Sequence, residues 1–431
     1  APRRPLLVVA GAGSGKTETM SMRVLWLLAN HPDLTPASIL GLTFTRKAAG
    51  ELGDRLRERI RLLSREMPQM RERLDEDPVA LTYNSFAERI VSEHGMRIGI
   101  DPDFSMLSEA GALDLMTQIV EAWPTDLDEE LRPIDAVPQV LHLAGELAEH
   151  GFTVESAREA LEELGRELSQ VGDTNVEARN LLRANRRRLA FLGPIATYQQ
   201  RKREMGVLDF SDQLVLATRI VREAPAVRAA LREEFRAVLL DEFQDTSVIQ
   251  MELLSTLFGD HAVTAVGDPN QAIYGWRGAS ASSLETFLDH FQSGAPEAGQ
   301  TLTLSTAWRN DVSILDAANR VAAPLREVAS YQQGKDALKA QSPVLVPRKG
   351  AGQGTVEIAY TQVYEDALAA TVDFVKRVRS QATKDGKRRT VAVLSRRRKD
   401  FPFIDAALRE AGIPTEIVGL GGLLDQPAVQ D

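Results

Sequence analysis

The run Gly11-Ala-Gly-Ser-Gly-Lys-Thr17, directly after the apolar segment Leu6–Val9, constrains the fold of this chain more than any other feature. Closely spaced glycines let successive backbone N–H groups turn towards one point, and a helix that starts there adds the positive end of its dipole. Apolar residues recur behind the run at helical spacing: Met20, Val24, Leu27 and Leu28. A strand, a glycine-rich turn and an amphipathic helix in this order predict a phosphate-binding loop.

The residue types within this loop indicate what it binds. We expect the backbone of its first five residues to surround phosphate oxygens: Gly11, Ala12, Gly13, Ser14 and Gly15. Lys16 would hold the β- and γ-phosphates, and the hydroxyl of Thr17 would bind Mg²⁺. Ala10 stands where the strict pattern has glycine, and an accidental glycine-rich turn is the alternative interpretation. The strand before the loop and the helix after it favour the phosphate site.

Further short apolar runs predict an α/β fold. They lie at Ile39–Phe44, Ala237–Leu240 and Val263–Val266, and each leads into a polar or glycine-containing turn followed by a helical pattern. Strands that alternate with helices predict an open parallel sheet covered on both sides. Ligands of such sheets bind beyond the carboxyl ends of the strands.

The 431 residues are enough for two to four domains. Between about residues 86 and 206 the strand runs nearly vanish, and one helical stretch at Val176–Met205 is long and basic. We expect this region to be a helical insertion, after which the sheet pattern resumes at Val207–Phe210. A second α/β unit is expected from about residue 299, with strand candidates at Thr301–Leu304, Thr355–Tyr360 and Val391–Leu394.

The composition excludes some classes of protein and leaves others open. Without cysteine, the chain forms neither disulfides nor thiolate metal sites. No apolar run approaches the roughly 18 residues of a membrane helix. A net charge of −10 argues weakly against nucleic acid as a ligand, although a local basic groove would suffice.

Two acids follow the apolar strand at 237–240. We expect Asp241 to hold Mg²⁺, directly or through water, and Glu242 to polarise the attacking water as a general base. An isolated acidic pair after a strand is usually just the start of a helix. Together with a phosphate loop it is typical of a site that hydrolyses a phosphoanhydride.

The strand at 263–266 leads into the run Gly267–Gly278. Gln271 has the reach and the amide to sense a γ-phosphate. Tyr274, Trp276 and Arg277 suit stacking on unpaired bases together with a phosphate contact, and a core Tyr and Trp are the alternative. Because the nucleotide sensor and the aromatic residues share one short loop, we favour the functional interpretation.

The tetrapeptide Ala307-Trp-Arg-Asn310 offers two further candidates. Arg309 could complete the triphosphate site from a neighbouring domain as an arginine finger. Trp308 could stack on adenine. By itself this tetrapeptide indicates little.

Taken together, these motifs resemble the UvrD/Rep/RecB branch of superfamily 1 DNA helicases over nearly the whole chain. The ordered matches are Gly11–Thr17 (motif I), Leu42–Ala49 (Ia), Thr82–Phe86 (Ib), Leu208–Asp212, Asp241–Thr246 (II), Gly267–Ala279 (III) and Leu304–Asn310 (IV). The resemblance implies two RecA-like P-loop domains, the second incomplete, with a helical insertion in the first. The implied division is 1–86 and 207–298 for the first domain, 87–206 for the insertion and 299–431 for the second domain.

The resemblance also implies an activity and its site. The chain would use ATP and Mg²⁺ to move 3′ to 5′ along single-stranded DNA and to unwind duplex junctions in DNA repair or recombination, such as the processing of double-strand breaks. DNA contacts are expected at Thr43, Phe44, Thr45, Arg46, Lys47, Tyr83, Asn84, Tyr274, Trp276 and Arg277. The wording of motifs Ia and III is closest to the AdnB motor subunit of bacterial AdnAB helicase–nucleases. It therefore implies a second helicase–nuclease subunit and a cytoplasmic bacterial protein that does not bind membranes.

Some positions depart from the family pattern. Asn84 replaces the usual His, Glu18 stands where relatives often have an Arg that lies on the base, and motifs V and VI are not seen. A non-motor, nucleotide-gated DNA-binding subunit of a helicase–nuclease complex is the alternative function. The visible catalytic residues argue against that alternative, and an unrelated P-loop kinase or transporter would not explain the loop from Gln271 to Arg277.

Overall fold

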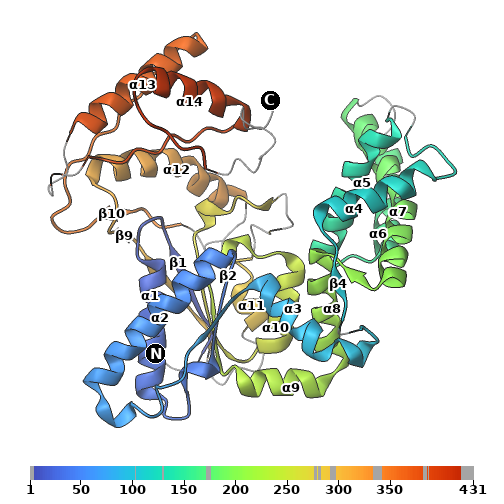
Figure 1. Cartoon of the computed structure of the whole chain (residues 1–431), viewed down its shortest axis with the longest axis horizontal. Helices are drawn as coiled ribbons and strands as arrows, with labels where there is room; N and C mark the ends of the chain where they lie inside the picture. Colours follow the sequence, from blue (N-terminus) through green and yellow to red (C-terminus); the bar gives the residue numbers. More distant parts are fainter. Residues whose placement is uncertain are drawn as a thin grey trace. The chain divides into compact units, whose positions relative to one another are not determined.

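The computed structural model is a mixed α/β protein that divides into two compact units, Ala1–Gly354 and Thr355–Asp431 (Figure 1). It describes residues 4–101, 103–128, 131–170, 176–275, 279, 283–291, 298–332, 342–381, 386 and 388–418. Among these residues, no helix combines the length and the apolar content that crossing a membrane requires.

A six-stranded sheet organises the first unit, and every neighbouring pair in it is parallel. Across the sheet the strands are β3 (Val79–Thr82), β2 (Ile39–Thr43), β6 (Ala237–Leu240), β7 (Ala262–Gly267), β1 (Leu6–Ala10) and β8 (Gln300–Leu304). The parallel sheet predicted from the apolar runs is therefore confirmed. The carboxyl ends of all six strands lie at one edge, which is where the candidate motifs begin.

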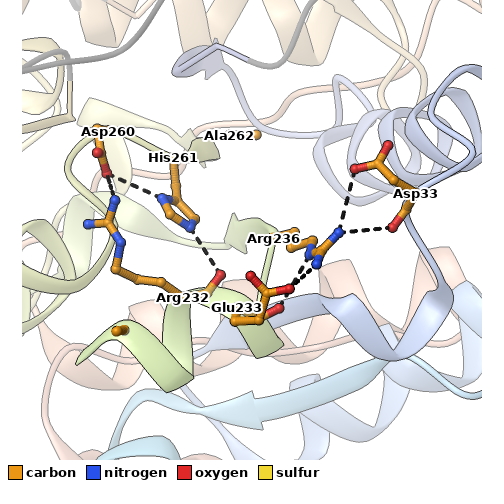
Figure 2. Close-up of a pocket in the computed structure, with 8 residues that line it drawn as sticks. Asp33, Arg232, Glu233, Arg236, Asp260, His261 and Ala262 are labelled. Atoms are coloured by element: carbon orange, nitrogen blue, oxygen red, sulfur yellow. Dashed lines mark hydrogen bonds and ion pairs between the residues drawn. The ribbon is translucent and has the colours of Figure 1, made fainter. Parts of the chain in front are cut away.

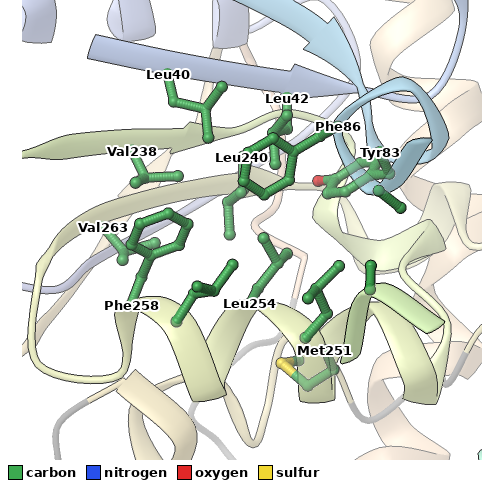
Figure 3. Close-up of a cluster of buried hydrophobic side chains, with 14 of the residues drawn as sticks. Leu40, Leu42, Tyr83, Phe86, Val238, Leu240, Met251, Leu254, Phe258 and Val263 are labelled. Atoms are coloured by element: carbon green, nitrogen blue, oxygen red, sulfur yellow. The ribbon is translucent and has the colours of Figure 1, made fainter. Parts of the chain in front are cut away.

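Alternate residues of each strand enter two separate cores, because side chains along a strand point to opposite faces. Leu7 and Val9 of β1 join the larger core, and Leu6 and Val8 join the other. Figure 3 shows the larger core, in which strand residues pack against Phe86 and Phe258. Both faces of the sheet are thus covered, as the continuous apolar strands require.

Helices cover both faces. The smaller core is covered by α1 (Lys16–Asn30) and α2 (Arg46–Glu66), and the four residues Met20, Val24, Leu27 and Leu28 are buried in it as predicted. The larger core contains residues of α3 (Tyr83–His94), α8 (Phe210–Glu223), α9 (Pro225–Glu234), α10 (Val248–Phe258) and α11 (Phe287–Phe291).

The helices between residues 109 and 205 share a core of their own. They are α4 (Glu109–Glu121), α5 (Pro133–Glu149), α6 (Val154–Gln170) and α7 (Val176–Met205). Helix α7 has the bounds of the predicted long helix. The short parallel pair β4 (Ser105–Met106) and β5 (Val207–Leu208) stands where the chain enters and leaves this group. Residues 87–94 do not belong to it, because Ala87, Ile90 and Val91 of α3 are buried in the large sheet core.

The strand Gln300–Leu304 differs from its predicted place. We expected it to open a second α/β unit, but β8 pairs with β1 from Leu6↔Gln300 to Ala10↔Leu304 and forms an edge of the first sheet. The physical reason is that β1 would otherwise present unpaired backbone groups at that edge. The chain continues through β9 (Thr306–Ala307), α12 (Val312–Gln332) and β10 (Val346–Pro347), still within the first unit.

The second unit contains α13 (Tyr364–Ser380) and α14 (Phe401–Glu410), which share a small core around Val375 and Leu408. The strands predicted at 355–360 and 391–394 are not formed. Ile358 is 91% exposed and Leu394 is 93% exposed. The apolar runs that suggested buried strands therefore have no partner to pack against in the described part of this unit.

Candidate functional site

The loop after β1 has the conformation that a phosphate site needs. Gly13 (φ 75°) and Gly15 (φ 93°) occupy the left-handed region that favours glycine. Ser14 donates both its N–H (3.2 Å) and its hydroxyl (2.7 Å) to the carbonyl of Gly11, which closes the turn. Helix α1 begins at Lys16, so its amino-terminal N–H groups lie beside the loop.

The two predicted acids lie at the end of β6, opposite this loop. Asp241 is buried, and burial together with the neighbouring charge of Glu242 raises the pKa of its carboxyl to about 6. Glu242 is the one non-glycine residue with a positive φ (49°) in the described chain. Its carboxylate accepts a 2.9 Å ion pair from Nζ of Lys16. The structure therefore brings together the lysine and the acids that the sequence predicted.

Gln244 connects this carboxylate to the next strand, a role that the sequence analysis missed. Its Nε2 donates to Oε2 of Glu242 (3.0 Å), and its Oε1 accepts the backbone N–H of Asp268 (3.0 Å). A Cβ on Gly267 would lie 2.8 Å from Oε1 of Gln244, closer than real Cβ contacts, so a side chain there would displace the amide. The one available signal was its position two residues after the predicted base.

Asp268 extends the network to the predicted γ-phosphate sensor. It is 2% exposed, and its carboxylate accepts hydrogen bonds from Nε2 of Gln271 (2.7 Å) and the hydroxyl of Ser342 (2.6 Å). A continuous series of bonds thus runs from Lys16 through the ends of β6 and β7 to Gln271.

The segment after β8 lies against the phosphate loop. The N–H of Trp308 donates to the carbonyl of Gly13 (2.8 Å), and a Cβ on Gly13 would lie 2.9 Å from Cβ of Arg309. This closeness follows from the pairing of β8 with β1, because the chain leaves the sheet at Leu304, directly beside Ala10. The backbone of Arg309 is therefore at the loop, and the side chain of Trp308 is 64% exposed beside it.

Aromatic residues from three predicted motifs meet at the same edge of the sheet. Phe44 stacks on Tyr274 with ring centroids 5.9 Å apart and an interplanar angle of 9°. Phe44 also contacts Tyr83, with ring centroids 5.4 Å apart and an interplanar angle of 63°. Tyr274, Trp276 and Arg277 were predicted to contact unpaired bases and phosphate, and of these Trp276 and Arg277 lie outside the described residues.

The remaining predicted DNA-contact residues divide by exposure. Tyr83 is 4% exposed, and its hydroxyl donates to the carbonyl of Asp241 (3.1 Å), so its ring is a core residue and not an open contact surface. Thr43 is likewise buried at the end of β2, and Thr45 caps α2 by accepting the N–H of Ala48. The exposed members of the set include Arg46 and Lys47.

A cavity of about 630 Å³ lies elsewhere, beside the amino-terminal ends of β6 and β7. Figure 2 shows that its charged groups pair with one another: Arg232 with Asp260, Arg236 with Glu233 and Asp33, and His261 with Asp260. Parallel sheets bind ligands at the opposite edge. We therefore interpret this cluster as a structural network that ties strand ends together.

Comparison with known proteins agrees with the site. Residues 1–292 match the model of the UvrD/REP helicase N-terminal domain. The chain is 26% identical to DNA helicase II of Escherichia coli, over all of this chain and 52% of that protein. It is 29% identical to DNA helicase II of Salmonella typhimurium, over 74% of this chain and 38% of that protein. It is 26% identical to ATP-dependent DNA helicase PcrA of Staphylococcus aureus, over 99% and 50%.

These matches extend across the motifs whose geometry is described above. The chain spans about half the length of the Escherichia coli and Staphylococcus aureus proteins. The matched family model covers the P-loop strand, both acids, the bridging Gln244 and the sensor loop. The chain belongs to the UvrD/REP helicase family, whose N-terminal domain it contains.

Proposed function

We propose that the protein is an ATP-dependent translocase that moves 3′ to 5′ along single-stranded DNA and unwinds duplex ahead of it. The observation that carries this proposal is the bonded series Lys16–Glu242–Gln244–Asp268–Gln271. It joins the phosphate loop to the loop that presents Tyr274. The names of the relatives, DNA helicase II and ATP-dependent DNA helicase PcrA, point the same way.

ATP and Mg²⁺ fit the residues present. Burial and the charge of Glu242 raise the pKa of Asp241, which means that its ionised form is unfavourable in the empty site. A cation bound beside the carboxylate would offset this cost. Thr17 and Asp241 offer the hydroxyl and carboxylate oxygens that Mg²⁺ prefers. The described residues contain no group of three or more His, Cys, Asp or Glu that could enclose a metal. Phosphate oxygens and water would therefore complete the Mg²⁺ shell, as is usual beside nucleotides.

The chain's own groups would then divide the work of hydrolysis. When bound, ATP supplies the phosphoanhydride and Mg²⁺ neutralises developing charge on its oxygens. Lys16 would exchange its bond with Glu242 for phosphate oxygens, and the freed carboxylate would accept a proton from water. Gln271 and Arg309 would contact the γ-phosphate, and Trp308 would cover the nucleotide. Occupancy of the loop would thus change the bonds made by Glu242 and Gln244.

DNA would be held at the neighbouring aromatic surface. Phe44 and Tyr274 offer faces for base stacking, and the exposed Arg46 and Lys47 offer charges for phosphates. Asn84, Trp276 and Arg277 are proposed to extend this surface. Gln271 lies three residues before Tyr274, so a shift of the sensor would move the stacking residue.

We also propose that this motor serves double-strand-break processing as an AdnB-type subunit, with a second helicase–nuclease subunit as its partner. The wording of Gly41–Lys47 and Gly267–Ser280 supports that assignment. In domain terms, the six-stranded sheet would be the first RecA-like domain, the helices α4–α7 its insertion, and the residues after β8 the start of the second domain.

The decisive experiment measures ATP hydrolysis by the protein with and without single-stranded DNA. We expect stimulation by DNA, and we expect Lys16→Ala to abolish both basal and stimulated turnover. An equal rate of ATP hydrolysis with and without single-stranded DNA would favour a non-motor, nucleotide-gated subunit. Full activity of Lys16→Ala would refute the site.

A further inference from the structure

Tyr83 contacts the backbone that joins the two predicted acids. It is the first residue of α3, and its ring lies in the larger core, where it is 4% exposed (Figure 3). Its hydroxyl donates to the carbonyl oxygen of Asp241 (3.1 Å). That carbonyl belongs to the peptide group between Asp241 and Glu242. A core tyrosine is therefore bonded to the chain that carries the proposed general base.

The residue that follows this peptide group has an unfavourable backbone conformation. Glu242 has φ 49° and ψ 42°, in the left-handed region that residues with a Cβ rarely adopt. Such conformations persist only where neighbouring groups hold them, and they occur most often at active sites. Rotation of the peptide group would change φ of Glu242 and move its carboxylate away from Lys16. The position of the proposed base therefore depends on what holds this peptide group.

Two hydrogen bonds hold the peptide group, one at each end. Its carbonyl accepts from Tyr83, and its N–H, which belongs to Glu242, donates to Oδ1 of Asp241 (3.0 Å). The Asp241 carboxylate is also a proposed cation ligand, so its bond to the N–H competes with that role. The bond from Tyr83 does not involve the carboxylate. Burial raises the pKa of the Tyr83 phenol above its ordinary value, so the hydroxyl stays protonated and remains a donor.

The carbonyl of Asp241 lies beyond the hydrogen bonds of the sheet. Strand β6 ends at Leu240, so this oxygen comes after the last pairing with the neighbouring strands. Water could satisfy a carbonyl at the edge of a sheet, but a water molecule can reorient. The ring of Tyr83 cannot, because the core packs closely around it. The contact therefore restrains the direction of the carbonyl as well as satisfying it.

We propose that Tyr83 is a positioning residue for hydrolysis, whose hydroxyl fixes the peptide group between Asp241 and Glu242 and thereby directs the carboxylate of Glu242. The inference rests on the proposed function, because it takes Glu242 as the group that accepts a proton from water. The role belongs to a single oxygen atom. Phenylalanine at position 83 would fill the same space in the core but would leave the carbonyl of Asp241 unrestrained.

The test removes this oxygen by Tyr83→Phe and measures ATP hydrolysis at saturating single-stranded DNA. We expect kcat to fall about threefold to tenfold, as the loss of one hydrogen bond would give. The KM for ATP should not change, because Lys16 and the phosphate loop keep their contacts. Tyr198→Phe is the matched control, since Tyr198 is 2% exposed and its hydroxyl donates to Oδ2 of Asp209 (3.1 Å), at the junction of α7 and α8. The control should retain the unaltered kcat.

Two further measurements separate positioning from a general structural role. In a Glu242→Gln background the carboxylate is already gone, so Tyr83→Phe should lower kcat no further, whereas a structural defect would add to the loss. In the nucleotide-free protein, hydrogen–deuterium exchange of residues 240–243 should be faster in Tyr83→Phe than in the unaltered protein or in Tyr198→Phe.

An unchanged kcat, a fall that adds fully to that of Glu242→Gln, or unchanged exchange would each overturn the inference and leave the proposed function standing. If the unaltered protein hydrolyses no ATP, the proposed function and this inference fall together.

Discussion

Nζ of Lys16 lies 2.9 Å from Oε2 of Glu242, so the lysine expected to hold phosphates is bonded to the carboxylate expected to activate water. The lysine side chain is 12% exposed and the glutamate 35%. In this arrangement each group neutralises the other. A bound triphosphate must break this ion pair before either group can act. The carboxylate of Glu242 is therefore free to accept a proton only when nucleotide occupies the loop.

Replacing Glu242 by Gln should separate binding from hydrolysis. The amide still accepts a bond from Lys16 but cannot take a proton, so we expect turnover to fall by roughly 10²–10⁴-fold. Nucleotide affinity should change little. Phosphate release and equilibrium binding of a fluorescent nucleotide measure the two quantities. A parallel loss of binding would show that Glu242 mainly shapes the loop.

Replacing Gln244 by Met should remove the hydrogen bonds that connect Glu242, after β6, to Asp268, after β7. The variant leaves the buried N–H of Asp268 without its acceptor, and we expect a loss of about 1–3 kcal/mol in the free energy of unfolding. It should also reduce stimulation of hydrolysis by DNA more than basal hydrolysis. Gln200→Met, an exposed change on α7, is the control. Unchanged stimulation in a folded Gln244→Met protein would rule out a coupling role.

Replacing Asp241 by Asn should stabilise the nucleotide-free protein. Burial raises the pKa of this carboxyl from 3.8 to about 6. A raised pKa means that the folded state binds the proton more tightly, so ionisation costs stability above pH 6 and the cost vanishes below about pH 4. We expect a gain of about 3 kcal/mol at pH 8 and none at pH 4. Urea unfolding at the two pH values tests this sign.

The same pKa predicts an acid limit for activity. Protonated Asp241 would bind Mg²⁺ poorly, and the pKa of about 6 belongs to the carboxyl without its cation, so in the presence of Mg²⁺ hydrolysis should fall at a pH below 6. Raising the Mg²⁺ concentration should shift the midpoint of this fall to lower pH. A midpoint that did not respond to Mg²⁺ would assign the limit to another group.

Replacing Lys202 by Met should destabilise the junction between α7 and α8. Lys202 is 4% exposed and pairs with Asp209 (2.5 Å) and Asp212 (2.6 Å). Removing it leaves two carboxylates without their cation, which typically costs about 3–5 kcal/mol. The double variant Lys202→Met, Asp212→Asn should recover part of this loss, because one uncompensated charge is gone. Equal stability of the single and double variants in urea would contradict the pairing.

The apolar runs and the glycine loop were sufficient to predict β1, β2, β6 and β7 and the meeting of Lys16 with the acids. Local pattern could not place Gln300–Leu304, because a strand does not reveal which sheet it will join. The same limit applies to Tyr83, whose position at the start of α3 gave no sign that its ring would be buried. Gln244 was missed because its role depends on a contact with the next strand. The strands predicted at 355–360 and 391–394 failed because apolar content alone does not supply a pairing partner.

The register that sets Ala10 beside Leu304 has a consequence for biogenesis. Residues separated by nearly 300 positions must meet before Trp308 and Arg309 can reach the loop at Gly13. Contacts of such high sequence separation form late and slowly, because the entropy of closing the intervening chain is lost first. During synthesis, the helices α4–α7 have a core of their own and can fold as they emerge, while the nucleotide site must wait for the last strand of its sheet.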